Sequence, residues 1–110
     1  MQIKTPQQAK VHAKAQLGAW GWESEAQWKC LNQLWTKESN WRSAAQNKTA
    51  VVQVRGGKRV KLYAGGIPQI LGLNPAIPVL QQINRGLTYI KFRYGSPCAA
   101  MRFWSMKKWY

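Results

Sequence analysis

The 110-residue sequence contains no aspartate, and its acidic residues are only three glutamates, at positions 23, 25 and 38. A serine–histidine–aspartate triad in its usual form is therefore excluded, because its third member is missing. His12 is the only histidine and there are two cysteines, without CxxC, CxxH or HxxxH spacing. The residue counts still allow a cysteine nucleophile that is activated by His12. A structural zinc site needs closely spaced ligands, so we expect no metal ion, and we expect no cofactor.

Long apolar runs are also missing, and none approaches the roughly 20 residues of a membrane span. The sequence after Met1 is polar and lacks the charged start, apolar core and cleavage site of a signal peptide. We therefore expect a chain that is made in a cytoplasm or is a segment of something longer. The length suffices for one domain with a buried core but not for two, so residues 1–110 are expected to form a single domain.

Against this scarcity of acids stand 17 Lys and Arg residues, which give a formal net charge of +14. Such a field attracts polyanions, whether nucleic acid, anionic lipid or an acidic cell wall. Because the basic residues are spread along the chain and not clustered, a solvated surface without a polyanionic partner also remains open. Most of the seven Trp residues are expected in the core, although such rings also stack on sugars and bases.

The N-terminal half predicts two helices. Thr5–Gln8 is a helix start with an N-cap, a proline at the first helical position and a capping box, and it precedes an Ala-, Lys- and Gln-rich run that reaches Gly18. Ser24 opens the second helix, with Gln27 as the partner in another capping box.

Valine-rich alternation on both sides of Gly56-Gly57 predicts a β-hairpin. A two-residue loop would put Lys61 and Arg59 opposite two valines of the first strand. A three-residue loop, at 56–58, would instead create one apolar face, and we expect this second arrangement. That face would consist of Val52, Val54, Val60 and Leu62.

Asn74-Pro75 suggests the start of a third helix that ends at Gly95, with Pro78 tolerated in its first turn. Gly65–Pro68 is a loop by composition. The segment from Cys98 to Tyr110 is compatible with a helix, although its apolar residues have no clean helical period. The apolar face of the third helix would comprise Val79, Leu80, Ile83, Leu87, Ile90 and Tyr94. The sequence thus predicts an α+β, mostly helical domain with a small β-hairpin.

Glu38 is the most informative position. It occupies the next place on an apolar stripe of the second helix, where a carboxylate does not belong. Burial and the negative end of the helix dipole would both raise its pKa toward neutrality, where a carboxyl can act as general acid and base. A Glu paired with Lys37 or Arg42, or exposed beyond the helix end, is the plainer alternative. The apolar stripe consists of Trp28, Leu31, Leu34 and Trp35.

Glycoside hydrolysis usually takes two carboxyls that lie roughly 5 to 9.5 Å apart. Glu25 precedes Glu38 by thirteen positions, or about 20 Å along a straight helix. Glu23 and Glu25 are explained by their favourable place at a helix N-terminus. An enzyme that acts on glycan would therefore use Glu38 alone. Peptidoglycan can supply the nucleophile through its N-acetyl group and C6 hydroxyl, which gives an anhydro-sugar.

Three ordered motifs resemble those of soluble lytic transglycosylases and goose-type lysozymes. Residues 35–41, Trp-Thr-Lys-Glu-Ser-Asn-Trp, resemble the Glu-Ser motif that holds the family's single catalytic acid/base. Residues 66–69, Gly-Ile-Pro-Gln, look like the second motif, whose Gln contacts the sugar, and residues 86–90, Gly-Leu-Thr-Tyr-Ile, resemble the third, whose Tyr lies near the Glu. The implied site residues are Glu38 for catalysis and Ser39, Gly66, Ile67, Gln69 and Tyr89 for the substrate.

Residues 30–39 and 89–100 are also similar to small transglycosylase-like domains of actinobacterial surface proteins and phage tail proteins. The likeness covers roughly residues 8–110 and implies a lysozyme-like fold with a Cys30–Cys98 disulfide. The hairpin around Gly56-Gly57 looks like an insertion between the first two motifs. The Tyr-Asn-containing fourth motif of larger transglycosylases is absent, although the terminal pair Trp109-Tyr110 resembles the end of the small domains.

The resemblance implies a lytic transglycosylase or muramidase that cleaves the β-1,4 bond between N-acetylmuramic acid and N-acetylglucosamine. Its partners would be peptidoglycan strands and anionic wall polymers. It would act on the cell wall as a phage lysin or virion-associated domain, or after export by a bacterium. Two alternatives remain open, namely a basic nucleic-acid-binding module and a catalytically inactive wall-binding relative.

Overall fold

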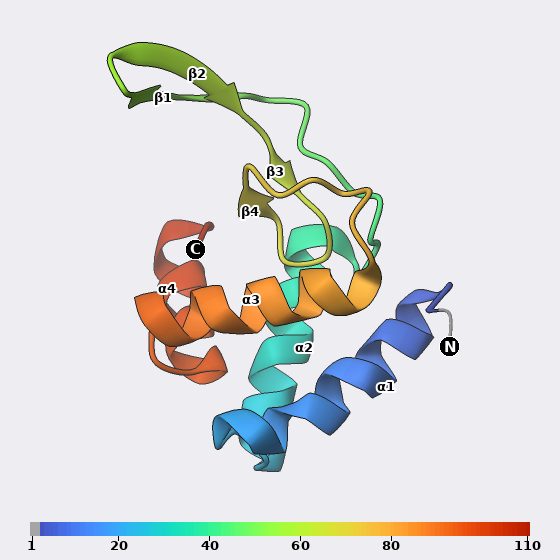
Figure 1. Cartoon of the computed structure of the whole chain (residues 1–110). Coiled ribbons are helices and arrows are strands. Elements are labelled where there is room, and N and C mark those ends of the chain that lie inside the picture. Colours follow the sequence, from blue (N-terminus) through green and yellow to red (C-terminus); the bar gives the residue numbers. More distant parts are fainter. Residues whose placement is uncertain (1–2) are drawn as a thin grey trace.

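The computed structural model describes residues 3–110, which form the expected α+β, mostly helical domain with a small hairpin (Figure 1). No helix within these residues is both long enough and apolar enough to cross a membrane. In chain order the elements are α1 (Pro6–Gln16), the 3₁₀ helix η1 (Leu17–Trp20), α2 (Glu25–Ser39), β1 (Val51–Arg55), β2 (Lys58–Leu62), β3 (Ala64–Gly65), β4 (Ile70–Leu71), α3 (Val79–Arg93) and α4 (Pro97–Lys107).

The start of α1 is as predicted. The Thr5 hydroxyl accepts a hydrogen bond from the Gln8 backbone N–H, and the Gln8 side chain accepts one from the Thr5 N–H, so both halves of the capping box are formed. The chain then tightens into η1. The left-handed residue that ends this turn is Gly21 (φ 77°), three positions beyond Gly18.

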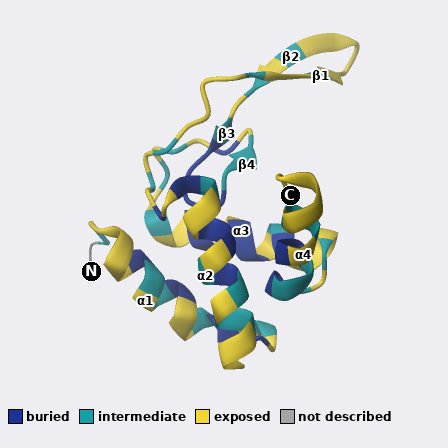
Figure 2. Cartoon of the chain, turned by 180° about the vertical axis from the view of Figure 1, so that it is seen from behind, coloured by how far each residue is buried: buried dark blue, intermediate teal, exposed yellow. Residues whose placement is uncertain are grey.

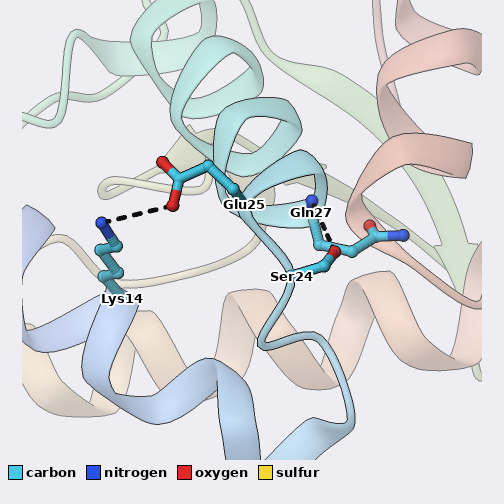
Figure 3. A network of polar contacts seen from close by, with 4 residues as sticks. All are labelled: Lys14, Ser24, Glu25 and Gln27. Carbon is cyan, nitrogen blue, oxygen red and sulfur yellow. Dashed lines mark hydrogen bonds and ion pairs between the residues drawn. The ribbon is translucent and has the colours of Figure 1, made fainter.

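The capping box predicted for α2 is only half formed (Figure 3). The Ser24 hydroxyl accepts from the Gln27 N–H, but the Gln27 side-chain oxygen accepts from the backbone N–H of Cys98 instead. This tertiary contact ties the start of α2 to the start of α4. A disulfide between Cys30 and Cys98, the pairing that the resemblance implied, joins the same two helices.

The core lies where α1, α2, α3 and α4 meet beneath the β3–β4 pair, and Figure 2 shows the buried residues gathered there. The apolar stripe of α2 faces this core, with Leu31, Leu34 and Trp35 fully buried. Three Trp residues are buried, three more pack partly buried against the core, and Trp109 is exposed. The buried residues of this cluster are Ala9, Ala13, Leu17, Trp22, Leu31, Leu34, Trp35, Trp41, Ile67, Ile83, Leu87, Ile90, Ala100, Met101 and Tyr110.

The observed strand register of the β1–β2 hairpin differs from the predicted one. Its loop has two residues, Gly56 and Gly57, both with positive φ, as a tight hairpin turn requires. Gln53 therefore pairs with Val60, while Lys61 and Arg59 lie opposite the valines. The three-residue loop was wrong because neither face of this hairpin is fully buried, so the turn rather than apolar burial sets the register. The valines that face the basic residues are Val52 and Val54.

The third helix begins later than predicted. Residues 74–77 form a turn in which the Asn74 side chain accepts from the Ala76 N–H, and α3 starts after Pro78. Leu80, expected on the apolar face, is exposed in the first turn of the helix. The C-terminal segment, whose apolar residues have no clean helical period, forms the helix α4. This helix begins at Pro97, and the Ser96 hydroxyl caps it by accepting a hydrogen bond from the Ala99 N–H.

Candidate active site

Glu38 occupies the last turn of α2, at the rim of the apolar stripe. Asn40 ends the helix in the left-handed conformation (φ 53°). The stripe below Glu38 is buried, whereas Glu38 itself is only partly exposed. The break in the apolar pattern thus marks the point where this helix face leaves the core.

Burial raises the pKa of the Glu38 carboxyl from 4.5 to about 7. A hydrogen bond of 2.9 Å from the Trp104 indole Nε1 to Glu38 Oε1 lowers the same pKa, but by less than burial raises it. At neutral pH this carboxyl therefore exists in both forms, which suits a group that must give up a proton and take one back.

No cation neutralises Glu38 within residues 3–110. The one ion pair there joins Lys14 to Glu25 across 3.7 Å at the other end of α2 (Figure 3). Lys37 lies over the Trp104 ring, with its Nζ 5.1 Å from the ring centroid. The Arg42 Nε donates to the Ser39 carbonyl at 3.2 Å. The alternative that Lys37 or Arg42 pairs with Glu38 is therefore wrong.

Glu38 opens into a cleft of about 600 Å³. The hairpin reaches over the C-terminal end of α4 (Figure 1), so β1 lines one side of the cleft and the chain end lines another. Gln69 and Tyr89, two of the implied substrate contacts, line the same cleft as Glu38. The full lining is Glu38, Asn47, Val51, Gln53, Arg55, Ala64, Gln69, Ile70, Leu71, Tyr89, Arg93, Lys108, Trp109 and Tyr110.

Gln69 is held firmly at the cleft. Its backbone is left-handed (φ 52°), and its side-chain Nε2 donates to the carbonyls of Gly66, at 2.9 Å, and Ala45, at 3.1 Å. These two bonds fix the amide nitrogen. No donor within residues 3–110 bonds the amide oxygen, so a hydroxyl or N–H of a ligand can reach an oriented acceptor there.

Three other implied contacts lie away from the cleft surface. Ser39, Gly66 and Ile67 are buried, and none of them lines the cleft. The Ser39 hydroxyl donates to the Ile67 carbonyl at 2.7 Å, and the Ile67 N–H donates to the Gln82 side-chain oxygen at 2.9 Å. Direct contact with a glycan does not fit this burial. These residues instead fix the loop that carries Gln69 to the end of α2.

Gly66 is a close-packing position with φ 73°. A Cβ placed on it would lie 2.6 Å from the Gln82 side-chain oxygen and 2.7 Å from a Leu73 methyl group. Gln82 is fully buried and also donates to the carbonyls of Ser43, Pro75 and Ile77. The segment Gly65–Pro68, which was predicted as a loop from its composition, is therefore buried and closely packed, and it supports Gln69.

Tyrosines from two parts of the chain surround the carboxyl. The Tyr89 hydroxyl donates to the Tyr110 main-chain oxygen at 2.9 Å, and the Tyr110 hydroxyl donates to the Pro68 carbonyl and accepts from the Trp35 indole N–H. Burial raises the pKa of Tyr94 to about 12, so it stays a neutral phenol. These contacts anchor the C-terminal residue into the floor of the cleft.

Sequence reasoning missed Trp104, Tyr94 and Tyr110 as neighbours of Glu38, together with the cleft-lining Arg55 and Lys108. Trp104 follows Glu38 by 66 positions, and no local spacing links the two. The only sequence signal was the resemblance of the terminal Trp-Tyr pair to the ends of small domains.

The chemistry available to this site is proton transfer by one carboxyl. Glu25 lies at the far end of α2 in its own ion pair, and Glu23 is exposed before that helix. Within the described part of the chain, no cluster of three His, Cys, Asp or Glu residues could hold a metal ion. A reaction here would therefore rely on Glu38 and on a nucleophile from the substrate or from water.

Comparison with protein-family models, with curated proteins and with solved structures finds no match. The likeness to lytic transglycosylases consequently rests on the sequence alone, on its three short motifs and on the blocks 30–39 and 89–100.

Proposed function

We propose that this domain cleaves the glycan strands of peptidoglycan, as a lytic transglycosylase or muramidase, with Glu38 as its single acid and base. The substrate bond would be the β-1,4 bond that joins N-acetylmuramic acid to N-acetylglucosamine. A lysozyme-like fold is part of the same proposal. The domain would reach the cell wall as a phage lysin or virion-associated part, or after export by a bacterium.

The observation that carries this proposal is the state of Glu38. It is the one acidic side chain that lines a cleft of about 600 Å³, its pKa is raised to about 7, and no basic side chain within residues 3–110 pairs with it. A surface Glu in a protein of net charge +14 would ordinarily attract a cation. The raised pKa and the lack of a cationic partner favour a role in proton transfer over the nucleic-acid-binding alternative.

In the first half of the reaction, protonated Glu38 donates its proton to the glycosidic oxygen. The bond from that oxygen to C1 breaks, and the leaving sugar departs as an alcohol. The N-acetyl oxygen of the muramic acid supports the positive charge that develops at C1. Because no second acidic side chain of residues 3–110 lines the cleft, the substrate itself would provide this assistance.

In the second half, the Glu38 carboxylate takes the proton of the attacking hydroxyl. Attack by the C6 hydroxyl of the same sugar forms a 1,6-anhydro ring, whereas attack by water gives a reducing end. Either route returns Glu38 to its protonated form, so the proton count balances. Gln69 and Tyr89 would position the sugar against Glu38, Gln69 through its oriented amide oxygen.

The test is digestion of purified peptidoglycan by the wild type, by Glu38→Gln and by Glu25→Gln, with mass analysis of the released fragments. Glu25→Gln is the matched control, because it makes the same change on the same helix outside the cleft. We expect fragments from the wild type and the control, and at least a hundredfold slower release by Glu38→Gln, in line with the usual contribution of a general acid.

Anhydro-ended fragments would identify a transglycosylase, and reducing ends would identify a muramidase. Release of no fragments by a folded wild type would overturn the proposal. Equal release by Glu38→Gln and the wild type would overturn the role of Glu38. Tight binding of nucleic acid by all three proteins, without cleavage of peptidoglycan, would favour the binding-module alternative.

A further inference from the structure

Three basic side chains and only one acidic side chain, Glu38, line the cleft among the described residues 3–110. Arg55 comes from the end of β1, Arg93 from the end of α3 and Lys108 from the residue after α4. None of them forms an ion pair within residues 3–110. No acidic side chain of the described residues therefore neutralises them by direct contact.

Each of these three exposed side chains contacts a neutral neighbour. The Arg55 Nη2 donates to the Gln53 side-chain oxygen at 3.2 Å. The Arg93 guanidinium lies 5.2 Å from the centroid of the Tyr89 ring, and the Lys108 Nζ lies 5.1 Å from that of Trp104. Such contacts orient a cation without neutralising it.

The hairpin register decides which basic residues face the cleft. Arg55 pairs with Lys58, and its face of β1 also carries Val51 and Gln53, which line the cleft. Arg59 pairs with Val54 on the other face and lies outside the cleft lining. Two arginines of the same short hairpin are thus separated by the pleat of the strand.

We infer that Arg55, Arg93 and Lys108 form a carboxylate-binding subsite, which makes the enzyme select glycan that carries acidic substituents over neutral glycan. This inference rests on the proposed function. A neutral sugar offers no anion to a guanidinium or an ammonium group, whereas the lactyl and peptide substituents of muramic acid carry carboxylates. Arginine binds a carboxylate through paired N–H donors, and lysine binds it as a point charge.

The three basic residues can attract an acidic ligand without forming an ion pair with Glu38. A cation in contact with Glu38 would stabilise its carboxylate and abolish the general acid at neutral pH. Burial and the Trp104 hydrogen bond, rather than a cation, dominate the pKa of Glu38. The three basic groups can therefore attract an acidic strand along the cleft and still leave the acid protonated.

The experiment compares one peptidoglycan preparation in two forms, untreated and with its free carboxylates converted to amides by carbodiimide and ammonia. The backbone is the same in both, and only the negative charge differs. Initial rates of fragment release are measured for the wild type, Arg55→Gln, Lys108→Asn and Arg59→Gln. Asn is chosen at 108 because it tolerates the left-handed backbone there (φ 64°).

We expect the wild type to digest untreated peptidoglycan several times faster than the amidated form. Arg55→Gln and Lys108→Asn should each lower this preference roughly two- to fivefold, the usual range for a partly exposed charge pair. Arg59→Gln removes the same charge from the same hairpin and should keep the wild-type preference.

The outcomes separate this inference from the proposed function. Digestion of neither form would overturn the proposed function. Digestion of both forms at the same rate by the wild type would overturn the subsite and leave the function standing. An equal loss of preference in Arg55→Gln and Arg59→Gln would also overturn the subsite, because it would assign the preference to net charge alone.

Discussion

The indole N–H of Trp104 donates a 2.9 Å hydrogen bond to the Glu38 carboxyl. Trp104 belongs to α4 and Glu38 to α2, and the Cys30–Cys98 disulfide joins these two helices. Lys37 and Lys108 lie over the Trp104 ring, each with its Nζ 5.1 Å from the ring centroid. Trp104 therefore contributes a neutral donor to Glu38, and the two lysines contact its ring and form no ion pair with the carboxyl.

Replacement of Trp104 by Phe should raise the pKa of Glu38 above 7. The indole hydrogen bond favours the carboxylate, so its loss leaves burial unopposed. The alkaline limb of the pH profile of kcat/KM, where the acid loses its proton, should move to higher pH. The direct measurement is an NMR titration of the side-chain carboxyl carbons, which is simple because the chain has three Glu and no Asp.

Trp20→Phe is the control for this titration, because Trp20 stacks on Trp22, away from the cleft. Its Glu38 titration should match that of the wild type. An unchanged or lowered pKa in Trp104→Phe would show that the hydrogen bond does not stabilise the carboxylate.

Glu38→Gln should stabilise the protein at alkaline pH. The pKa of Glu38 is 4.5 in an unfolded chain and about 7 in the folded protein. Between these two pH values the folded state holds a proton that the unfolded state has lost. Wild-type stability is therefore greatest at and below pH 4.5 with respect to this group, and it falls as the pH rises to 7. Discounted for partial exposure, the loss is about 2 kcal/mol.

The neutral amide that Glu38→Gln introduces would keep the Trp104 hydrogen bond and lack this pH dependence. The variant should therefore exceed the wild type by about 2 kcal/mol at pH 8 and match it near pH 4.5. Urea unfolding at both pH values measures the difference, with the disulfide intact. Glu25→Gln, at the exposed pair with Lys14, should show no such gain. Equal stabilities of Glu38→Gln and wild type at pH 8 would contradict the burial of this carboxyl.

Gly86→Ala should destabilise the domain by about 1 to 3 kcal/mol, although Ala is the better helix former. A Cβ on Gly86 would lie 2.5 Å from Trp35 Cζ2 and 2.8 Å from Pro68 Cβ, where α3 crosses α2. The substitution would also displace the loop that carries Gln69. Gly18→Ala is the control, since no atom lies within 4 Å of its added Cβ, and it should be neutral or slightly stabilising. Urea unfolding of both variants checks the contrast, and equal effects would count against close packing at Gly86.

Helix starts were readable from the sequence where the signal is local. The N-caps of α1 and α2 depend on residues three positions apart, and both hydroxyls act as predicted. The start of α3 was misplaced because Asn74-Pro75 is also a good turn signal, and Pro78 makes the residue before it unfavourable for a helix.

The hairpin register and the second half of the α2 capping box could not be read in this way. The register prediction assumed a buried valine face, which an arm extending from the helical body does not have. The Gln27 side chain instead accepts a hydrogen bond from the N-terminus of α4, which lies next to it only in the folded chain.

Local sequence was enough to establish the α+β class, the helix caps and the position of an anomalous carboxyl on an apolar helix face, because these follow from neighbours within a few residues. The second and third sequence motifs also identified Gln69 and Tyr89 as candidate site residues. The folded chain was needed to show that Trp104 holds Glu38, that Ser39 and Ile67 are buried, and which arginine of the hairpin faces the cleft. These are contacts between segments far apart in the chain, and desolvation of a carboxyl depends on everything that packs around it.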